Sequence, residues 1–334
     1  MATKQKDRIR LTIREALSEA LREEMLRDDR VFIMGEEVGV WGGTYAVTRG
    51  FYDEFGERRV RDTPISEMAI VGAGTGAAMA GLRPVAELMT INFAFLALDA
   101  IINHAAKVHY MFGGQFTVPL VIRTTTGGGR QLGATHSHAP EPIFAHFPGL
   151  YVITPATPYD AKGLLKAAIR SDNPVLFVEH ATLYQTRGDM PIPEDDDFII
   201  PLGVSDRKRH GDDVTLVTFS KGLYWCLEAA EKLSKEGIEA DIIDVRALRP
   251  LDLSLALESI RKTHRAVVVE ESLPLFSFGS EVAAQLQEHA FDDLDAPVLR
   301  VSAADVPLPY SRDLEQHALP DADKVVAAVK EIMY

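Results

Sequence analysis

The stretch VRDTPISEMAIVGAGTGAAMAGLRPVAELMTINF, residues 60–93, decides the fold and sets one acidic side chain beside an apolar segment. Glu67 comes just before residues 70–81, which are rich in glycine and alanine and carry no charge. Small residues let a second backbone or a ligand approach closely. A carboxylate beside such a surface is costly unless something hydrogen-bonds to it. What Glu67 binds therefore bears directly on function.

One interpretation of this stretch is a dinucleotide site, because residues 72–77 match the pattern G-x-G-x-x-A. That pattern needs a strand before it and an acidic residue about 20 positions after it. Here Ser66 or Thr63 predicts a helix N-cap with Glu67 in the first turn, and the next acid, Glu87, follows too soon. The glycines are therefore expected inside a close-packed helix, which we prefer to a nicotinamide site.

Length and composition favour a two-domain globular protein. The chain has 334 residues, of which 46% are apolar and 25% charged, enough for two hydrophobic cores. The net charge of −14 disfavours nucleic acid and anionic membranes and favours a basic protein partner. Cys226 is the single cysteine, so no internal disulfide is expected. The N-terminus lacks the apolar core of a secretory signal, and no apolar run reaches membrane-spanning length, so we expect a cytoplasmic protein.

Predicted strands and helices alternate along most of the chain. The pattern predicts strands at residues 31–34, 84–88, 118–123, 151–154, 175–179, 214–219, 240–244, 266–269 and 298–301. It predicts helices from Thr12, from Glu67, and at 98–110, 157–170, 222–236, 253–261, 279–289 and 321–332. The prolines and acidic run of residues 187–204 indicate a linker, which we place at 191–204. This alternation is typical of α/β domains with mainly parallel sheets.

Three local features are candidates for chemistry. Glu36 and Glu37 follow the predicted strand 31–34, at the sheet edge where ligands bind in open parallel sheets, although a solvated loop is equally compatible. The loop 124–133, TTTGGGRQLG, lacks the ending of a phosphate-binding P-loop and leads to His136 and His138. A histidine after such a loop suits proton transfer better than metal binding, since no third ligand lies nearby.

The chain resembles the beta subunit of thiamine-diphosphate-dependent 2-oxo acid dehydrogenases, over roughly residues 9–332. The resemblance lies in MGEEV (34–38), DTPISE (62–67), GAAMAGLRPVAELM (76–89), HYMFGGQ (109–115), the loop ending in His136 and Ser137, PGL (148–150), TPYDAKGLLKAAIR (157–170), LEAAEKLSKEGIEADIIDVRALRPLD (227–252) and DVPLPYS (305–311). It implies a pyrimidine-type thiamine diphosphate domain at 1–190 and a transketolase-C-terminal-like α/β domain at 205–334. The second domain would serve dimerisation and docking to an acyltransferase core.

The resemblance also implies the cofactor contacts. Glu67 would hydrogen-bond the pyrimidine ring nitrogen opposite the 4′-amine and favour the tautomer that removes the thiazolium proton. Phe93 would lie against the aminopyrimidine ring. The remaining pocket residues would be Ile65, Ser66 and Met89, and many relatives have glutamine at the last position. Glu36 would belong to a proton path between two cofactors.

Further implications concern catalysis, metals and partners. His136 would donate or accept a proton as the acyl group moves to lipoyl, with His138 where relatives often have glutamine. The chain lacks the G-D-G motif for magnesium and diphosphate, so an alpha subunit would hold Mg²⁺ and that half of the cofactor in an α2β2 tetramer. A potassium ion in relatives implies ligands here at Leu120, Ala168, Ser171 and Asn173, with serine replacing the aspartate of some relatives.

The implied reaction is oxidative decarboxylation of a 2-oxo acid, pyruvate first, with transfer of the acyl group to lipoyl. Acetoin dehydrogenase and branched-chain 2-oxo acid dehydrogenase subunits share segments such as residues 110–115, so the substrate stays open. A non-catalytic docking scaffold is a different class of answer. The presence of Glu67, Phe93 and His136 together argues against it.

Overall fold

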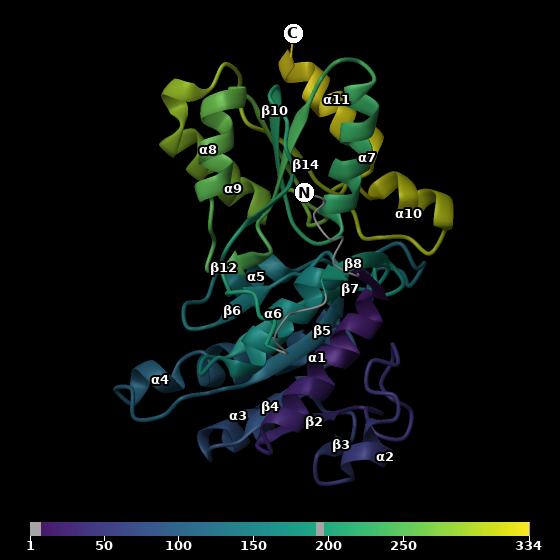
Figure 1. Cartoon of the computed structure of the whole chain (residues 1–334), viewed down its shortest axis with the longest axis vertical. Coiled ribbons are helices and arrows are strands. Elements are labelled where there is room, and N and C mark those ends of the chain that lie inside the picture. Colours follow the sequence, from purple (N-terminus) through teal and green to yellow (C-terminus); the bar gives the residue numbers. More distant parts are fainter. Residues whose placement is uncertain (1–7, 192–196, 334) are drawn as a thin grey trace, which may run out of the picture. The chain divides into compact units, whose positions relative to one another are not determined.

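A computed structural model describes residues 8–191 and 197–333 and divides the chain into two units (Figure 1). The first unit comprises Met1–Thr125, Phe147–Glu179 and Leu183–Leu202. The second comprises Thr126–His146, His180–Thr182 and Gly203–Tyr334, so it includes two segments from the N-terminal half of the sequence. The domain boundaries predicted at 190 and 205 stay a prediction, because these units interleave along the chain.

A mainly parallel sheet forms the core of the first unit, with strand order β6-β7-β5-β4-β2-β3. The strands are β2 (Val31–Gly35), β3 (Val60–Asp62), β4 (Arg83–Glu87), β5 (Val121–Thr126), β6 (Tyr151–Ile153) and β7 (Val175–His180). Strand β2 pairs in parallel with both β3 and β4, which aligns Gly35 with Asp62 and Glu87. The carboxyl ends of these three strands therefore lie at one sheet edge.

Helices in the first unit begin largely where the sequence predicts. They are α1 (Ile13–Arg27), α2 (Phe51–Phe55), α3 (Glu67–Met79), the 3₁₀ helix η1 (Ile91–Ala97), the π-helix η2 (Asp99–Ala105), α4 (Val108–Met111) and α6 (Pro158–Arg170). The Thr12 side chain and Glu15 form the predicted capping box of α1. The glycines of residues 72–77 lie inside α3, which removes the strand-to-helix turn that a dinucleotide site needs.

Two predicted segments differ from the structure. The helix predicted at 98–110 is divided into η2 and α4, and Asp99 contacts Asn103 and His104, four and five residues on, as the wider π turn allows. Strand β8 (Arg187–Pro191) ends where the linker was predicted to begin and pairs antiparallel with β1 (Arg8–Thr12). This pairing has no local sequence signal, because its two strands are nearly 180 positions apart. Residues 192–196 of the predicted linker lie outside the described residues.

The second unit has its own sheet, with strand order β14-β13-β10-β11-β9. The strands of this sheet are β9 (Asp206–Arg209), β10 (Val214–Thr218), β11 (Ala240–Asp244), β13 (Ala266–Val269) and β14 (Leu299–Val301). The unit also contains the short strand β12 (Ala247–Arg249), which does not belong to this sheet. Its helices are α5 (Glu141–Ala145), α7 (Gly222–Ser234), α8 (Ser254–Thr263), α9 (Phe278–His289), the 3₁₀ helix η3 (Phe291–Asp293), α10 (Arg312–Ala318) and α11 (Ala322–Met333). Only β9, which pairs antiparallel with β11, departs from the parallel pairs given for this sheet. The predicted α/β class with mainly parallel sheets is confirmed for both units.

Among the described helices, no single one is long and apolar enough to span a membrane, although the bent pair Ile91–Ala97 and Asp99–Met111 meets the length and composition test together.

Candidate functional site

Two acidic side chains meet at the carboxyl edge of the first sheet. Glu36 directly follows β2, and Glu67 opens α3 after β3. Both are buried, Glu36 at 7% exposure and Glu67 at 4%. The pKa of Glu36 is raised by burial and then by the negative charges of Glu67 and Glu37. The structure therefore brings together two carboxyls that the sequence places 31 positions apart.

Glu67 has no protein hydrogen-bond partner among the described residues, although it is almost fully buried. The neighbouring Thr63 hydroxyl is likewise buried without a partner. Ser66 stands at the N-cap of α3, as predicted, but its side chain makes no capping hydrogen bond. Buried polar atoms in native proteins nearly always have partners. The Glu67 carboxyl and the Thr63 hydroxyl, four positions apart in the sequence, therefore each leave hydrogen-bonding capacity for a polar ligand.

The other predicted pocket residues lie on the segments next to this edge. Ile65 is 83% exposed and Ser66 is exposed, so the approach to α3 is open in the isolated chain. Met89 follows β4 and accepts a hydrogen bond at its carbonyl from the Thr125 hydroxyl, at 3.0 Å. Phe93 is half-buried in η1. An aromatic side chain and apolar residues on segments that adjoin an acidic sheet edge suit a small aromatic heterocycle.

A buried ionic network beneath this edge was not anticipated from the sequence. The Arg123 guanidinium donates to the carboxylates of Glu87 and Glu179, and the Tyr184 hydroxyl donates to Glu179. All four side chains are buried, and Tyr184 stacks on Tyr45 with ring centroids 4.4 Å apart. The available sequence signal is one of these charged residues within each of the strands β4, β5 and β7.

Glu87 links this ionic network to the candidate site. Glu87 is the last residue of β4, two positions before Met89. The backbone of Gly43, with φ of +75°, lies so close to Glu87 that an added Cβ would approach its Oε1 atom to 2.7 Å. The residues that follow Glu36 and Glu37 are therefore packed onto the buried network, which fixes one wall of the carboxyl edge.

His136 belongs to the second unit, in the loop between β5 and α5. Its side chain is exposed, and its Nδ1 atom lies 2.8 Å from the Thr135 hydroxyl. The neighbouring Ser137 hydroxyl is buried without a hydrogen-bond partner in the described chain. Burial lowers the pKa of His138. An exposed imidazole at the end of a glycine-rich loop can exchange protons with a reactant that comes from outside the chain.

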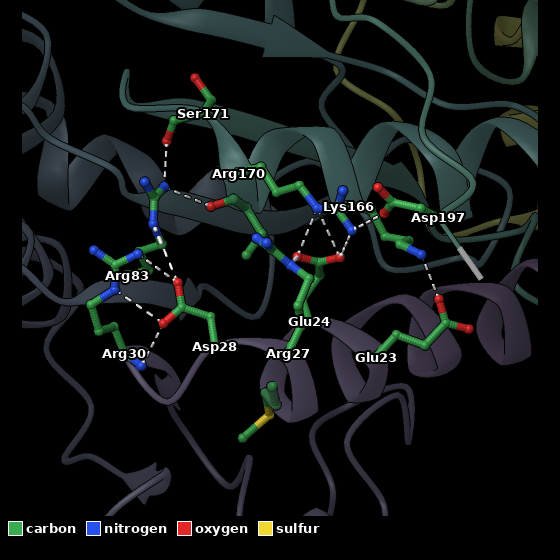
Figure 2. A network of polar contacts seen from close by, with 12 residues as sticks. Glu23, Glu24, Arg27, Asp28, Arg30, Arg83, Lys166, Arg170, Ser171 and Asp197 are labelled. Atoms are coloured by element: carbon green, nitrogen blue, oxygen red, sulfur yellow. Dashed lines mark hydrogen bonds and ion pairs between the residues drawn. The ribbon is translucent and has the colours of Figure 1, made fainter. Parts of the chain in front are cut away.

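The turn after α6, where potassium ligands were expected, already contains a cation. The Arg83 guanidinium donates to the carbonyl oxygens of Ile169 at 3.0 Å and Ser171 at 3.1 Å, and to the Asp172 carboxylate at 2.5 Å. Figure 2 shows Arg83 between Ser171 and Asp28, next to the ion pairs that join α1 and α6. One positive charge is therefore already supplied to this turn from β4.

The remaining expected potassium ligands also have partners. The Leu120 carbonyl accepts from the Val175 amide at 2.8 Å, and the Ala168 carbonyl accepts from the Ser171 amide at 3.2 Å. The Asn173 amide donates to the Ser171 hydroxyl at 3.1 Å. Each carbonyl oxygen keeps a second lone pair, but the adjacent Arg83 guanidinium already supplies a positive charge, so the potassium site stays a prediction. In the described chain no group of three histidine, cysteine or acidic side chains is arranged to hold a metal.

Sequence comparison matches both units to known domains. The transketolase pyrimidine-binding domain matches residues 10–187, and the transketolase C-terminal domain matches residues 203–325. The pyruvate dehydrogenase E1 component subunit beta of Rhizobium meliloti is 49% identical over 97% of this chain and 70% of its own length. The mitochondrial protein of the same name from Caenorhabditis elegans is 48% identical over 96% and 92%. The chain belongs to the E1 beta-subunit family of 2-oxo acid dehydrogenases.

Other members of this family differ in substrate by name. The 2-oxoisovalerate dehydrogenase subunit beta of Bacillus subtilis is 45% identical over 95% of this chain and 97% of its own length. Among solved structures, a split-gene transketolase described as an inactive beta4 tetramer superposes with a TM-score of 0.75 at 25% identity, covering 97% of this chain and 98% of its own. The E1 beta family resemblance predicted from the motifs is thus confirmed.

Proposed function

We propose that this chain is the beta subunit of the decarboxylating E1 component of pyruvate dehydrogenase. The observation that carries the proposal is the buried, unpartnered carboxyl of Glu67 at the carboxyl edge of a pyrimidine-binding domain. The pyruvate dehydrogenase names of relatives at 45–49% identity support this substrate. The reaction is oxidative decarboxylation of a 2-oxo acid and transfer of the acyl group to lipoyl.

The residues at the sheet edge fit the pyrimidine half of thiamine diphosphate. When bound, this cofactor supplies a nucleophilic carbon that attacks the carbonyl of the 2-oxo acid. Glu67 would accept a hydrogen bond from the protonated ring nitrogen, a contact that no described residue makes with this carboxyl. Phe93 would cover a face of the ring, with Ile65, Ser66 and Met89 along its rim. Glu36 would belong to a proton path between two cofactors, and its pKa, raised by burial and by the charges of Glu67 and Glu37, suits proton exchange.

The partners follow from what this chain lacks. It has no G-D-G motif, so we assign the diphosphate and Mg²⁺ to an alpha subunit and expect an α2β2 assembly. The second unit would dock an acyltransferase core, and the net charge of −14 suits a basic docking module. A cytoplasmic location stays a prediction, and several relatives are mitochondrial by name. His136 would act later, as a proton donor or acceptor during acyl transfer to lipoyl.

A branched-chain substrate is the second candidate, favoured by the 45% identity to the 2-oxoisovalerate dehydrogenase subunit. Acetoin stays a third possibility from the resemblance. Turnover of the complex reconstituted with the alpha subunit, measured with pyruvate, acetoin and 3-methyl-2-oxobutanoate in parallel, distinguishes them. Pyruvate should have the highest kcat/KM. A higher value for either other substrate would replace this assignment.

Glu67→Gln tests the assigned chemistry. The substitution keeps the side-chain shape but removes the charge, so assembly with the alpha subunit should be normal while decarboxylation falls by about 100-fold or more. Glu57→Gln, an exposed change of the same charge in the same unit, is the matched control. Near-normal turnover by Glu67→Gln would contradict the role and would favour a non-catalytic docking scaffold.

A further inference from the structure

Two buried carboxylates of the C-terminal domain converge on the loop that carries His136. We call residues Gly127–Gly133 the glycine loop. Glu271 follows β13 and is 9% exposed, whereas Glu315 lies on α10 and is fully buried. Both reach backbone amides of the glycine loop from sequence positions more than 140 residues away. Neither residue belongs to the cofactor contacts considered above.

Glu271 holds the first half of the glycine loop. Its Oε1 atom accepts a hydrogen bond from the Gly128 amide at 2.6 Å, and its Oε2 atom lies 2.7 Å from His180 Nε2. The Thr182 amide donates to His180 Nδ1 at 3.2 Å, so Nδ1 accepts and the ring proton lies on Nε2, facing Glu271. Burial opposes ionisation of Glu271, but His180, the Gly128 amide and Lys221 together lower its pKa. A charged acceptor therefore anchors Gly128.

Glu315 holds the second half of the glycine loop. Its Oε1 atom accepts from the amides of Gly129 at 3.0 Å and Gln131 at 3.2 Å. Its Oε2 atom accepts from the Gln131 side-chain amide at 2.7 Å. The carboxyl group of Glu315 thus holds two backbone amides and one side-chain amide of this loop.

Packing explains why glycine is needed at these positions. Gly127, with φ of +91°, lies against the His180 imidazole with no room for a Cβ atom. A Cβ at Gly128 would approach Leu308 to 2.7 Å, and one at Gly133 would approach the Tyr310 ring to 2.5 Å. The loop therefore lies directly on the segment that leads into α10, without side chains of its own in between.

The base of the loop is closed close to His136. The Gly127 amide donates to the His138 carbonyl at 3.1 Å, and the Thr126 hydroxyl donates to the same oxygen at 3.2 Å. The His136 amide lies 3.3 Å from the Gly133 carbonyl. The backbone that carries the imidazole therefore follows a closed loop, in which Glu271 and Glu315 hold the amides of Gly128, Gly129 and Gln131.

We propose that Glu271 and Glu315 are positioning residues that hold the glycine loop so that His136 meets the acyl group and lipoyl in a fixed orientation. This inference rests on the proposed role of His136 in acyl transfer. The carboxylates touch neither cofactor nor substrate. They act through the backbone of the loop, and loss of either should leave decarboxylation itself intact.

Glu315→Gln tests the proposal in the full chain assembled with its alpha subunit. The amide group of glutamine presents N–H donors to backbone N–H donors, so at least one anchoring hydrogen bond is lost. Amide hydrogen exchange in residues 128–133 should accelerate by about 10-fold or more. Asp313→Asn, an exposed loss of the same charge on the same helix, is the control and should exchange at the wild-type rate.

Two activity assays test whether the loop contacts affect acyl transfer rather than decarboxylation. Reduction of an artificial electron acceptor reports decarboxylation, and reductive acylation of lipoyl reports the complete transfer. Glu315→Gln should lower lipoyl acylation by about the same factor as His136→Ala and leave the artificial-acceptor rate near wild type. Unchanged exchange in residues 128–133, or faster exchange with normal lipoyl acylation, would overturn the proposal.

A milder variant guards against misfolding of Glu315→Gln. Gln131→Asn keeps a residue that tolerates the left-handed conformation at this position, where φ is +56°, but shortens the amide that reaches Glu315. It should give a smaller acceleration of exchange and a smaller loss of lipoyl acylation, in the same direction. If the His136→Ala variant acylates lipoyl normally, the proposed role of His136 is wrong, and so is the positioning role of the two carboxylates. The amide exchange rates would still show whether Glu271 and Glu315 anchor the glycine loop.

Discussion

Arg123→Met is the substitution whose loss of folding stability can be estimated most directly from the structure. Arg123 is 2% exposed and pairs with two carboxylates, Glu87 and Glu179, which are also buried. Methionine fills much of the same volume but provides no charge. Two carboxylates would then remain in a buried site with the Tyr184 hydroxyl as the remaining described donor.

The expected loss follows from the cost of an unpaired buried charge. Removing one partner of a buried ion pair costs about 3–5 kcal/mol. In a unit of about 150–250 residues each kcal/mol lowers the melting temperature by about 2–4 °C. We therefore expect the first unit to unfold about 6–20 °C below wild type. Because Glu87 lies behind the pocket and against Gly43, cofactor affinity should fall as well.

The stability loss of Arg123→Met should also depend on pH in a definite direction. Burial, helped by the charge of Glu179, raises the pKa of Glu87 even though Arg123 opposes this. Without Arg123 the folded state would bind protons on these carboxyls more tightly than the unfolded state does. The loss in stability should therefore be largest near pH 8 and shrink as the pH falls toward 5.

Thermal and urea denaturation followed by circular dichroism measure this effect. Arg30→Met is the matched control, because Arg30 is exposed and pairs with Asp28 at the surface, where such a pair contributes about 0–1 kcal/mol. If Arg123→Met and Arg30→Met lose the same small amount, the reasoning about the buried network is wrong.

Three further predictions concern other groups. Burial raises the pKa of Glu141 to about 7, and its Oε2 atom is buried without a hydrogen-bond partner in the described chain. The Glu141 carboxyl therefore holds its proton more tightly in the folded protein than in the unfolded chain. The free energy of unfolding of wild type should fall as pH rises from about 4.5 to about 7. Above pH 7, Glu141→Gln should be more stable than wild type by up to about 3 kcal/mol, and a less stable variant at pH 8 would contradict this. Because Arg83 already supplies a positive charge to the turn after α6, exchanging NaCl for KCl at constant ionic strength should not change the wild-type melting temperature, and Arg83→Met should melt lower in both salts. A saturable stabilisation of wild type by K⁺ would instead support the potassium site. Finally, the isolated chain should bind thiamine diphosphate weakly in calorimetry until the alpha subunit is added, and tight binding without it would refute the shared site.

Features encoded locally could be predicted from the sequence. The capping box at Thr12, the helix start at Glu67 and the proline-initiated helix at Pro158 each depend on residues within one turn. The alternation of apolar strands with amphipathic helices gave the α/β class for the same reason. The motifs around Glu67 and His136 then indicated the E1 beta family, which sequence comparison confirms.

Features that depend on distant partners could not be predicted. The ionic network joins Glu87, Arg123 and Glu179 across three strands, 36 and 56 positions apart. Likewise, nothing near Glu315 in the sequence indicates that it binds amides 184 and 186 positions earlier. The carboxyl of Glu67 was expected to have a binding role. That its charge raises the pKa of Glu36 could not be predicted, because it depends on the parallel register of β2 and β3.

The interleaving of the two units has a consequence for how this gene could be divided or shuffled. A fragment that begins after residue 202 would keep Glu271 and Glu315 but lose the amides that they bind, leaving two desolvated acids inside a supposedly autonomous module. The complementary fragment would release residues 126–146 and 180–182 from the surface that shapes them. Recombination at the apparent border should therefore yield poorly expressed products, and natural fusions of this polypeptide are expected to join at its ends.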